Sequence, residues 1–290
     1  MGNHRNNSGT CAGNRTPDCY WRYSIAIGAT RLAVGGLFLL CLVLLTRKFS
    51  LKNWPVKTTL LAAISMAVYQ PLFFSAVTIT GVAIGTVIAI GTAPILSGVI
   101  EWLFLNKRQN ALWWSSTILS ILGCLMLFFN KESVQVEPVG ILMALGAGLS
   151  FATYTIVSRE LVVQYSSLSV VAVVFTLSAI ILSPILFIYD LSWIMSVNGI
   201  GASLHLGIMA TGIAYFLFAK GVSHISPSTS VTLALAEPLT AAILGVLVLG
   251  EYLSATSWIG IFLLIFGIVL LIWSSEKPDI NKNYEQVEKF

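Results

Sequence analysis

The sequence is organised as nine long apolar segments joined by short polar connections. The segments are 24–46, 58–79, 82–105, 110–129, 138–157, 167–189, 203–221, 227–250 and 255–273. About 20 apolar residues in a helix cross the roughly 30 Å hydrocarbon core of a bilayer. Segments this long do not fit the short alternating strands of a barrel, and an open sheet cannot satisfy its backbone in lipid. The pattern therefore predicts an all-α fold, a polytopic membrane helix bundle with the lipid bilayer as its surroundings.

The composition agrees with a membrane location. Hydrophobic residues make up 57% of the chain and charged residues 10%, whereas soluble globular proteins have roughly 45–50% apolar and about 25% charged residues. Basic residues lie between the apolar segments and form no continuous stripe, so we expect no nucleic-acid partner. Three scattered histidines and four cysteines without a CxxC pair predict no metal site. We also expect no cofactor.

The distribution of Lys and Arg indicates the orientation of the bundle. With nine spans, eleven basic residues fall on one side of the membrane and four on the other. The larger set is Arg47, Lys48, Lys52, Lys57, Lys107, Arg108, Arg159, Lys220, Lys277, Lys282 and Lys289. Cytoplasmic connections carry the excess of Lys and Arg. We therefore expect a cytoplasmic C-terminus and a multi-pass protein of a bacterial inner membrane.

An internal repeat relates the two halves of the chain. After a shift of 144 residues, residues 60–127 align with 204–271 without a gap. Identical pairs include Pro94 with Pro238, Trp114 with Trp258, Gly123 with Gly267 and Phe74 with Phe218. Equivalent segments are five spans apart along the chain, and this odd offset makes them cross the membrane in opposite directions. Such an inverted repeat is typical of secondary transporters.

The repeat also predicts the domain organisation. A polar N-terminal segment, 1–23, precedes an incomplete first repeat, 24–129, and a second repeat, 138–273, precedes a cytoplasmic tail, 274–290. The segment 138–157 has no apolar counterpart in the first repeat, because the equivalent position holds only polar residues. We therefore expect a ten-helix design without its first helix, through a mis-assigned start, a frameshift or a natural variant.

Residues 234–272 resemble the closing segment of the EamA family in the drug/metabolite transporter superfamily. The resemblance rests on Glu237-Pro238, on Gly250-Glu251 and on the Gly-rich last segment. The first half keeps Pro94 but has Asn106-Lys107 where the family has Gly-Glu. The resemblance implies ten helices in two inverted repeats, a central cavity, and export or exchange of amino acids and related metabolites.

Glu237 lies mid-segment in 227–250, directly before Pro238. An ionisable side chain at membrane depth is costly and marks a functional candidate, and a mid-helix proline kinks its helix. One interpretation is a hinge beside a carboxylate that binds a substrate amine or a proton. The other is that Glu237 pairs with a neighbouring helix and Pro238 only shapes the bundle. Pro94 is the equivalent hinge candidate in the first repeat.

Aromatic and polar residues at matching depths are candidates for lining a central cavity, with ordinary helix packing as the alternative. They are Tyr69, Gln70, Phe74, Thr92, Tyr154, Tyr215 and Phe218. Gln70 is a strong candidate because a buried amide needs hydrogen-bond partners. Arg31 is expected to snorkel outward, to pair with Glu237 or to clamp a substrate carboxylate. Glu101 is expected to pair with Lys107 or Arg108.

These features predict a secondary transporter of small metabolites, working by alternating access around a central cavity. No phosphate-binding loop is present, which disfavours direct use of ATP. Paired catalytic groups are absent at membrane depth, which disfavours an intramembrane enzyme. The alternatives are a broad drug-efflux or nucleotide-sugar carrier, and an inactive or truncated membrane protein. The expected partner is a small-molecule substrate. The GxxxG of Gly81 and Gly85 is expected to pack helices within one chain rather than to join two chains, and a homodimer stays open.

Overall fold

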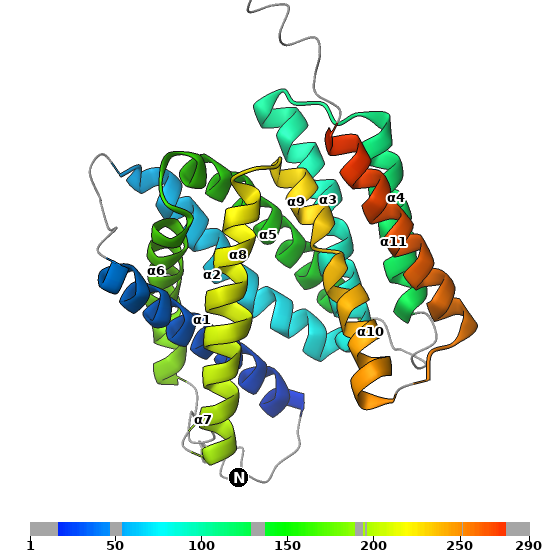
Figure 1. The fold of residues 1–290 in the computed structure, drawn as a ribbon. Coiled ribbons are helices and arrows are strands. Elements are labelled where there is room, and N and C mark those ends of the chain that lie inside the picture. The colour runs from blue at the N-terminus through cyan, green and yellow to red at the C-terminus, as the bar shows by residue number, and fades with distance from the viewer. Residues whose placement is uncertain are drawn as a thin grey trace, which may run out of the picture.

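The computed structural model is a helical bundle (Figure 1) that describes residues 17–46, 54–128, 137–188, 194, 196–250 and 252–276. Its helices are α1 (Pro17–Thr46), α2 (Val56–Thr80), α3 (Val82–Leu105), α4 (Ala111–Phe128), α5 (Pro138–Gln164), α6 (Ser167–Ile188), α7 (Val197–Leu204), the π-helix η2 (His205–Ile213), α8 (Ala214–Val222), α9 (Pro227–Leu233), α10 (Ala236–Leu249) and α11 (Ala255–Glu276). In the described ranges, nine helical stretches are long and apolar enough to span a membrane. This confirms the predicted polytopic bundle.

Several helices extend beyond the apolar segments. α1 begins at Pro17, inside the stretch 1–23 that was predicted to precede the bundle, and α11 continues to Glu276, past the predicted end at 273. A helix does not need an apolar sequence once it leaves the hydrocarbon core, and proline is favoured in the first helical turn. The apolar segments therefore mark the depth of the bilayer rather than the ends of the helices.

Two segments predicted as single helices are interrupted. The segment 203–221 corresponds to α7, η2 and α8, and the segment 227–250 is divided between α9 and α10 at Ala234 and Leu235. Pro238 has no N–H to donate to the carbonyl of Ala234, which accepts from the N–H of Glu237 at 2.9 Å instead. The missing donor contributes to the departure of the backbone from the α-helical pattern one turn before the proline.

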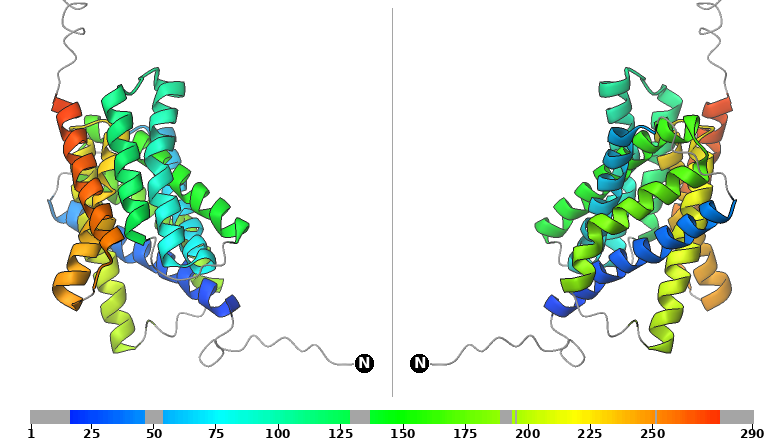
Figure 2. Two further views of the ribbon diagram at one scale, coloured as in Figure 1. Left: turned by 90° about the vertical axis from the view of Figure 1, so that its right-hand side faces the viewer. Right: turned by 90° about the vertical axis from the view of Figure 1, so that its left-hand side faces the viewer.

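The two repeats pack against each other through equivalent helices. α1 packs on α6, and α4 packs on α11, and the members of each pair occupy equivalent places in the repeat. Figures 1 and 2 show α4 and α11 running side by side along one edge of the bundle. A Cβ atom added at Gly123 would lie 2.7 Å from the carbonyl oxygen of Gly260, and the reverse distance is also 2.7 Å. Glycine therefore allows the two backbones to touch.

α3 and α10 end in the same backbone conformation. Asn106 (φ 52°) and Gly250 (φ 67°) both adopt the left-handed region, and their N–H groups donate to the carbonyls of Glu101 and Gly245. All four positions are related by the shift of 144 residues. Asparagine tolerates the left-handed region better than other non-glycine residues do. The replacement of Gly by Asn in the first repeat thus preserves the helix end.

Substitution of Asn106 tests this helix end. Asn106→Val is expected to lower the free energy of unfolding by about 1–2 kcal/mol, because a β-branched residue is strained at positive φ. Asn106→Gly is the matched control and is expected to leave stability unchanged or slightly raised. Thermal unfolding of the purified variants in detergent checks both. Equal stability of the two variants would contradict the assigned conformation.

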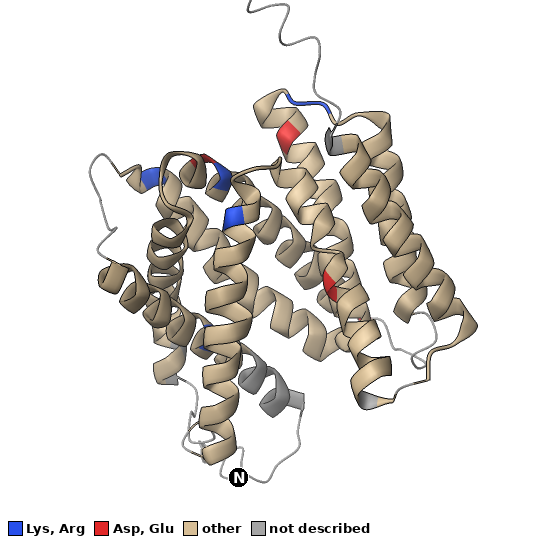
Figure 3. Ribbon diagram, viewed as in Figure 1, with Lys and Arg blue, Asp and Glu red and all other residues tan. Residues whose placement is uncertain are grey.

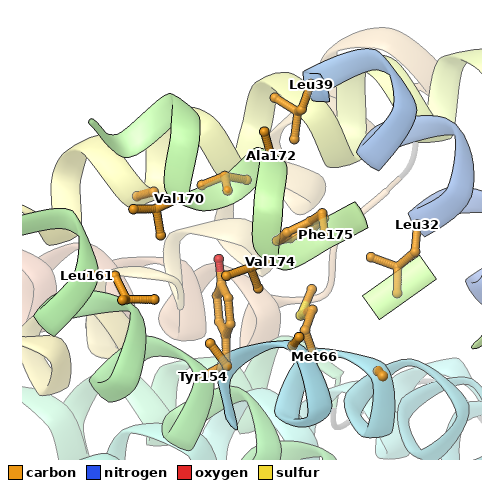
Figure 4. Packing of buried hydrophobic residues seen from close by; sticks show 14 of the residues in the cluster. Leu32, Leu39, Met66, Tyr154, Leu161, Val170, Ala172, Val174 and Phe175 are labelled. Carbon is orange, nitrogen blue, oxygen red and sulfur yellow. The ribbon is translucent and has the colours of Figure 1, made fainter. Parts of the chain in front are cut away.

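A large hydrophobic core joins α1, α2, α5 and α6. Figure 4 shows Tyr154 and Phe175 at its centre, among Leu32 and Leu39 of α1 and Met66 of α2. All five side chains are fully buried. The core fixes α5 and α6 of the second repeat against α1 and α2 of the first.

The helices of the second repeat are less covered than their counterparts. In α2 and α3, 44% of the residues in the most apolar window are buried, against 28% in Val197–Val222 and in Pro227–Val248. α5 packs along α2 and α3, and no described helix covers the equivalent face of the second repeat. The flank of α10 is consequently open, with Leu247 and Val248 exposed by 76% and 71%.

Charged side chains are concentrated at one end of the bundle. Figure 3 shows the Lys and Arg residues of the described ranges mainly at the end where α3 finishes and α4 begins. The C-terminal end of α11 lies at this same end (Figure 1). Glu237 and Arg31 are exceptions, because both belong to the interiors of spanning helices.

Candidate functional site

A cavity lies where α2 and α3 of the first repeat meet α5, α8, α9 and α10 of the second. Its enclosed volume is about 50 Å³, and the space that includes the part open to the outside is about 390 Å³. Its lining consists of Tyr69, Ala89, Ile90, Ala93, Phe151, Tyr215, Val231, Ala234 and Glu237. The walls are mainly apolar and aromatic with one carboxylate, the composition expected of a small-molecule site.

Glu237 supplies the carboxylate of the cavity. It lies in the first turn of α10, directly after the interruption that separates this helix from α9. Its side chain is exposed although the surrounding span is apolar. The equivalent residue of the first repeat is Ala93, which is only 1% exposed. The cavity is therefore electrostatically asymmetric, with its negative group on the second repeat.

The three aromatic residues of the lining, Tyr69, Phe151 and Tyr215, belong to a larger cluster of rings. The ring of Phe151 lies 5.6 Å from that of Tyr69 and 5.7 Å from that of Phe218, centroid to centroid. Phe218 lies 6.3 Å from Tyr215, and Tyr69 stacks on Phe73 at 5.5 Å. The predicted residues Tyr69, Tyr215 and Phe218 are thus brought together. Phe151 was missed, although it precedes Tyr154 by three residues and so shares its helix face.

Two other candidates lie behind the cavity wall rather than in its lining. Tyr154 is 1% exposed, and its ring lies 6.1 Å from both Phe175 and Tyr215 (Figure 4). The hydroxyl of Thr92 donates to the carbonyl of Ile88 at 2.6 Å, within its own helix. Thr92 also packs on α5, where a Cβ added at Gly148 would lie 2.6 Å from its oxygen. Direct roles of Tyr154 and Thr92 in binding remain predictions.

Pro94 and Pro238 differ in their surroundings. α3 continues through Pro94 without interruption, whereas the chain leaves the α-helix before Pro238. Both rings are buried. The two hinge candidates of the sequence therefore have equivalent positions and different local backbones, and their hinge roles remain predictions.

A second group of candidate residues lies at the interface of α1 and α2, and it consists of Arg31, Gln70 and Phe74. The Nε of Arg31 donates to the hydroxyl of Thr211 at 3.0 Å, and its guanidinium carbon lies 5.8 Å from the ring centroid of Phe74. This geometry contradicts the interpretation of Arg31 as a snorkelling residue, because Thr211 is 0% exposed. The bonding to Thr211 holds Arg31 inside the bundle. Gln70 is 1% exposed.

Glu101 connects α3 with the start of α9. Its carboxylate accepts hydrogen bonds from the Ser228 hydroxyl at 2.7 Å and from the Gln109 amide at 2.5 Å. The side chain is 1% exposed. The predicted pairing with Lys107 or Arg108 is wrong, because the α3 C-terminal turn directs the carboxylate toward Ser228 and Gln109 instead.

Removal of the Glu101 carboxylate tests how much its hydrogen bonds contribute to the stability of the protein. Glu101→Ala is expected to lower the free energy of unfolding by about 2–3 kcal/mol, because it leaves the buried Ser228 hydroxyl without its charged acceptor. Glu160→Ala is the matched control, since Glu160 is exposed on α5. Thermal unfolding of the two variants measures the difference. Equal midpoints would show that the Glu101 bonds add nothing to stability.

Comparison with known proteins shows similarity along most of the chain. The model of the EamA-like transporter family matches residues 22–129 and 138–273. The uncharacterized transporter YwfM of Bacillus subtilis is 49% identical over 247 residues, which cover 85% of this chain and 83% of YwfM. The uncharacterized transporter YdfC of the same organism is 26% identical over 243 residues, covering 82% and 78% of the two chains.

A solved crystal structure has a similar fold. It superposes with a TM-score of 0.76 at 17% sequence identity, covering 91% of this chain and 96% of the other. At this level of identity the likeness concerns the fold alone, and it supports the arrangement of helices described above.

Proposed function

Because the chain belongs to the EamA-like transporter family, and is therefore an integral multi-pass membrane transporter, we propose that it carries small metabolites such as amino acids as a secondary transporter. In this proposal an ion or substrate gradient supplies the energy, and the solute leaves the cell or is exchanged. The transporter names of its relatives favour a carrier over an intramembrane enzyme.

The main support for the proposal is the position of Glu237 in the cavity lining. Its carboxylate lies on the wall of a cavity at membrane depth, beside Tyr69 and Tyr215. A carboxylate among apolar walls favours a cationic group such as a protonated amine, or a coupling proton. The aromatic rings add apolar contact area and, with a cation, an attractive interaction with their faces. A small solute with an amino group fits both.

Alternating access follows from the position of the cavity between two inverted repeats. The α9–α10 interruption lies directly before Glu237, and α3 carries Pro94 on the opposite wall. In the proposed mechanism the two repeats rock against each other, and these sites absorb the change in backbone direction. The cavity then opens to each side of the membrane in turn.

The proposed orientation places the Lys- and Arg-rich end of the bundle in the cytoplasm. Lys57 lies in the first turn of α2, Arg108 in the connection from α3 to α4, Arg159 near the end of α5 and Lys220 near the end of α8. The positive-inside preference then gives a cytoplasmic C-terminus in the inner membrane of a bacterium. Alkaline phosphatase and fluorescent-protein fusions at the C-terminus test this, and an active phosphatase fusion would reverse the assignment.

Counterflow in proteoliposomes tests the substrate class. Vesicles loaded with a mixture of unlabelled L-amino acids are expected to take up the matching labelled amino acid transiently above equilibrium. Vesicles without protein are the control. Inhibition by lipophilic cationic dyes, without counterflow of any amino acid, would instead favour the drug-efflux alternative, which the aromatic wall and the single carboxylate also fit.

A further inference from the structure

Arg31 is a cation inside the bundle whose hydrogen-bonding capacity is mostly unused. A guanidinium has five N–H donors. Among the described residues, Arg31 has one hydrogen bond, to Thr211, one ring contact, with Phe74, and no ion pair. Charged side chains within membrane spans are costly and normally pair with another group. Among the described residues Arg31 thus has no anionic partner, and this lack of a partner requires an explanation.

Gln70 adds a second unsatisfied group at the same helix interface. Both its amide nitrogen and its amide oxygen are buried without a hydrogen-bond partner. A Cβ added at Gly28 would lie 2.9 Å from the Phe74 ring and 3.3 Å from the Cβ of Gln70. Gly28 precedes Arg31 by one helical turn in α1, so these side chains belong to one α1–α2 interface. A buried amide without partners is destabilising, and this one belongs to the same helix interface as Arg31.

Thr211 fixes the direction of the guanidinium. The Thr211 hydroxyl donates its proton to the carbonyl of Leu206 at 2.8 Å, within the π-helix η2. Its oxygen is then free only to accept, and it accepts from the Nε of Arg31. π-helical turns occur frequently at functional sites. This bond occupies Nε and leaves the two terminal nitrogens, which form the planar fork that suits a carboxylate.

The position of Arg31 connects this group to the cavity. The guanidinium of Arg31 lies over the ring of Phe74, which is 5.6 Å from the ring of Phe73, and Phe73 stacks at 5.5 Å on Tyr69 of the cavity lining. Thr211, which accepts the hydrogen bond of Arg31, precedes Tyr215 of the lining by four residues. A cation on α1 thus lies behind the aromatic residues that share the cavity lining with the carboxylate of Glu237 on α10. No direct ion pair joins the two in the described ranges.

We propose that Arg31, with Gln70 beside it, binds the carboxylate of the transported solute. This inference rests on the proposed transport function and narrows its substrate to zwitterions. The solute's amino group faces Glu237, and its carboxylate accepts hydrogen bonds from the free guanidinium nitrogens and from the Gln70 amide. The arrangement distinguishes amino acids from simple amines and from amides, since these lack the anionic group.

Competition between free acids and their carboxamides tests the proposal. Counterflow of the best labelled L-amino acid is measured against increasing concentrations of the same unlabelled acid or its carboxamide. The unmodified protein is expected to prefer the free acid by about 30-fold or more, because the carboxamide leaves the half-buried guanidinium without an anion. In Arg31→Gln the preference is expected to fall to about onefold.

Three further variants separate binding from folding. Arg108→Gln removes the same charge from an exposed site near Trp102 and is expected to keep the full preference. Arg31→Lys keeps the charge without the planar fork and is expected to keep part of it. Gln70→Leu replaces an unsatisfied amide by an apolar side chain, so it is expected to raise thermal stability while reducing the preference for the free acid.

The outcomes distinguish this inference from the function on which it rests. Counterflow of amino acids with equal inhibition by acids and carboxamides would overturn the carboxylate site and leave the transport function standing. Absence of counterflow for every amino acid would overturn both. If Arg31→Gln does not yield folded protein, Gln70→Leu and Arg31→Lys decide, and an unchanged preference in both would overturn the proposal.

Discussion

Replacing Glu237 by glutamine is expected to reduce counterflow by about a hundredfold, because the variant keeps the size of the side chain and removes the charge that faces the amine. The neutral amide costs less in an apolar span than the carboxylate does. The variant should therefore insert and fold as well as the unmodified protein. Initial rates of counterflow in proteoliposomes, normalised to the amount of reconstituted protein, measure the loss.

The matched control for this substitution is Glu160→Gln. Glu160 is exposed on α5, away from the cavity lining, and its neutralisation is expected to leave the rate unchanged. Size-exclusion profiles of both variants verify that they are folded. A Glu237→Gln variant with the full rate would reduce Glu237 to a packing residue and remove the main support for the proposed carrier mechanism.

Gly260→Val in α11 is expected to cause a large loss of stability. A Cβ at this position would lie 2.7 Å from the Gly123 carbonyl oxygen and 2.9 Å from the Leu127 nitrogen, both of which are backbone atoms. Neither can move without separating α4 from α11. We expect the free energy of unfolding to fall by about 3 kcal/mol, at the upper end of the range for overpacking.

Gly201→Val in α7 is the control for this prediction. A Cβ at Gly201 meets no atom within 4 Å, so the same change in residue type is tested without the close contact. The yield of monodisperse protein and the midpoint of thermal unfolding are compared between the two variants. Similar values would mean that α4 and α11 are not packed backbone to backbone.

The topology was predictable because it depends on features that repeat over many residues. Long apolar segments fix the number of spans in a bilayer, and the 144-residue shift relates the two halves through Pro94 and Pro238. The equivalent ends at Asn106 and Gly250 strengthen this relation, although the two residue types differ. Backbone conformation is thus conserved between the repeats where side-chain identity is not.

The details of the site depend on tertiary contacts, and they were less predictable. The contact between Arg31 and Thr211 was not predictable, since the two residues lie 180 positions apart and the contact depends on how η2 packs on α1. The interruption before Pro238 also exceeded the expected kink, whereas Pro94 is accommodated within a continuous helix. The same residue type gave two backbones because the neighbouring helices differ.

Because one flank of α10 is not covered by another described helix, the surrounding lipid is expected to influence how this helix sits in the bundle. Leu244, Leu247 and Val248 are exposed on this flank, so acyl chains are expected to cover them in a bilayer, whereas α5 covers α2 and α3 in the other half. Mismatch between a span and the bilayer thickness is accommodated by tilting, and α10 has few protein neighbours to resist it. The acyl-chain length of the reconstitution lipid is therefore expected to change the tilt of α10, and with it the position of Glu237.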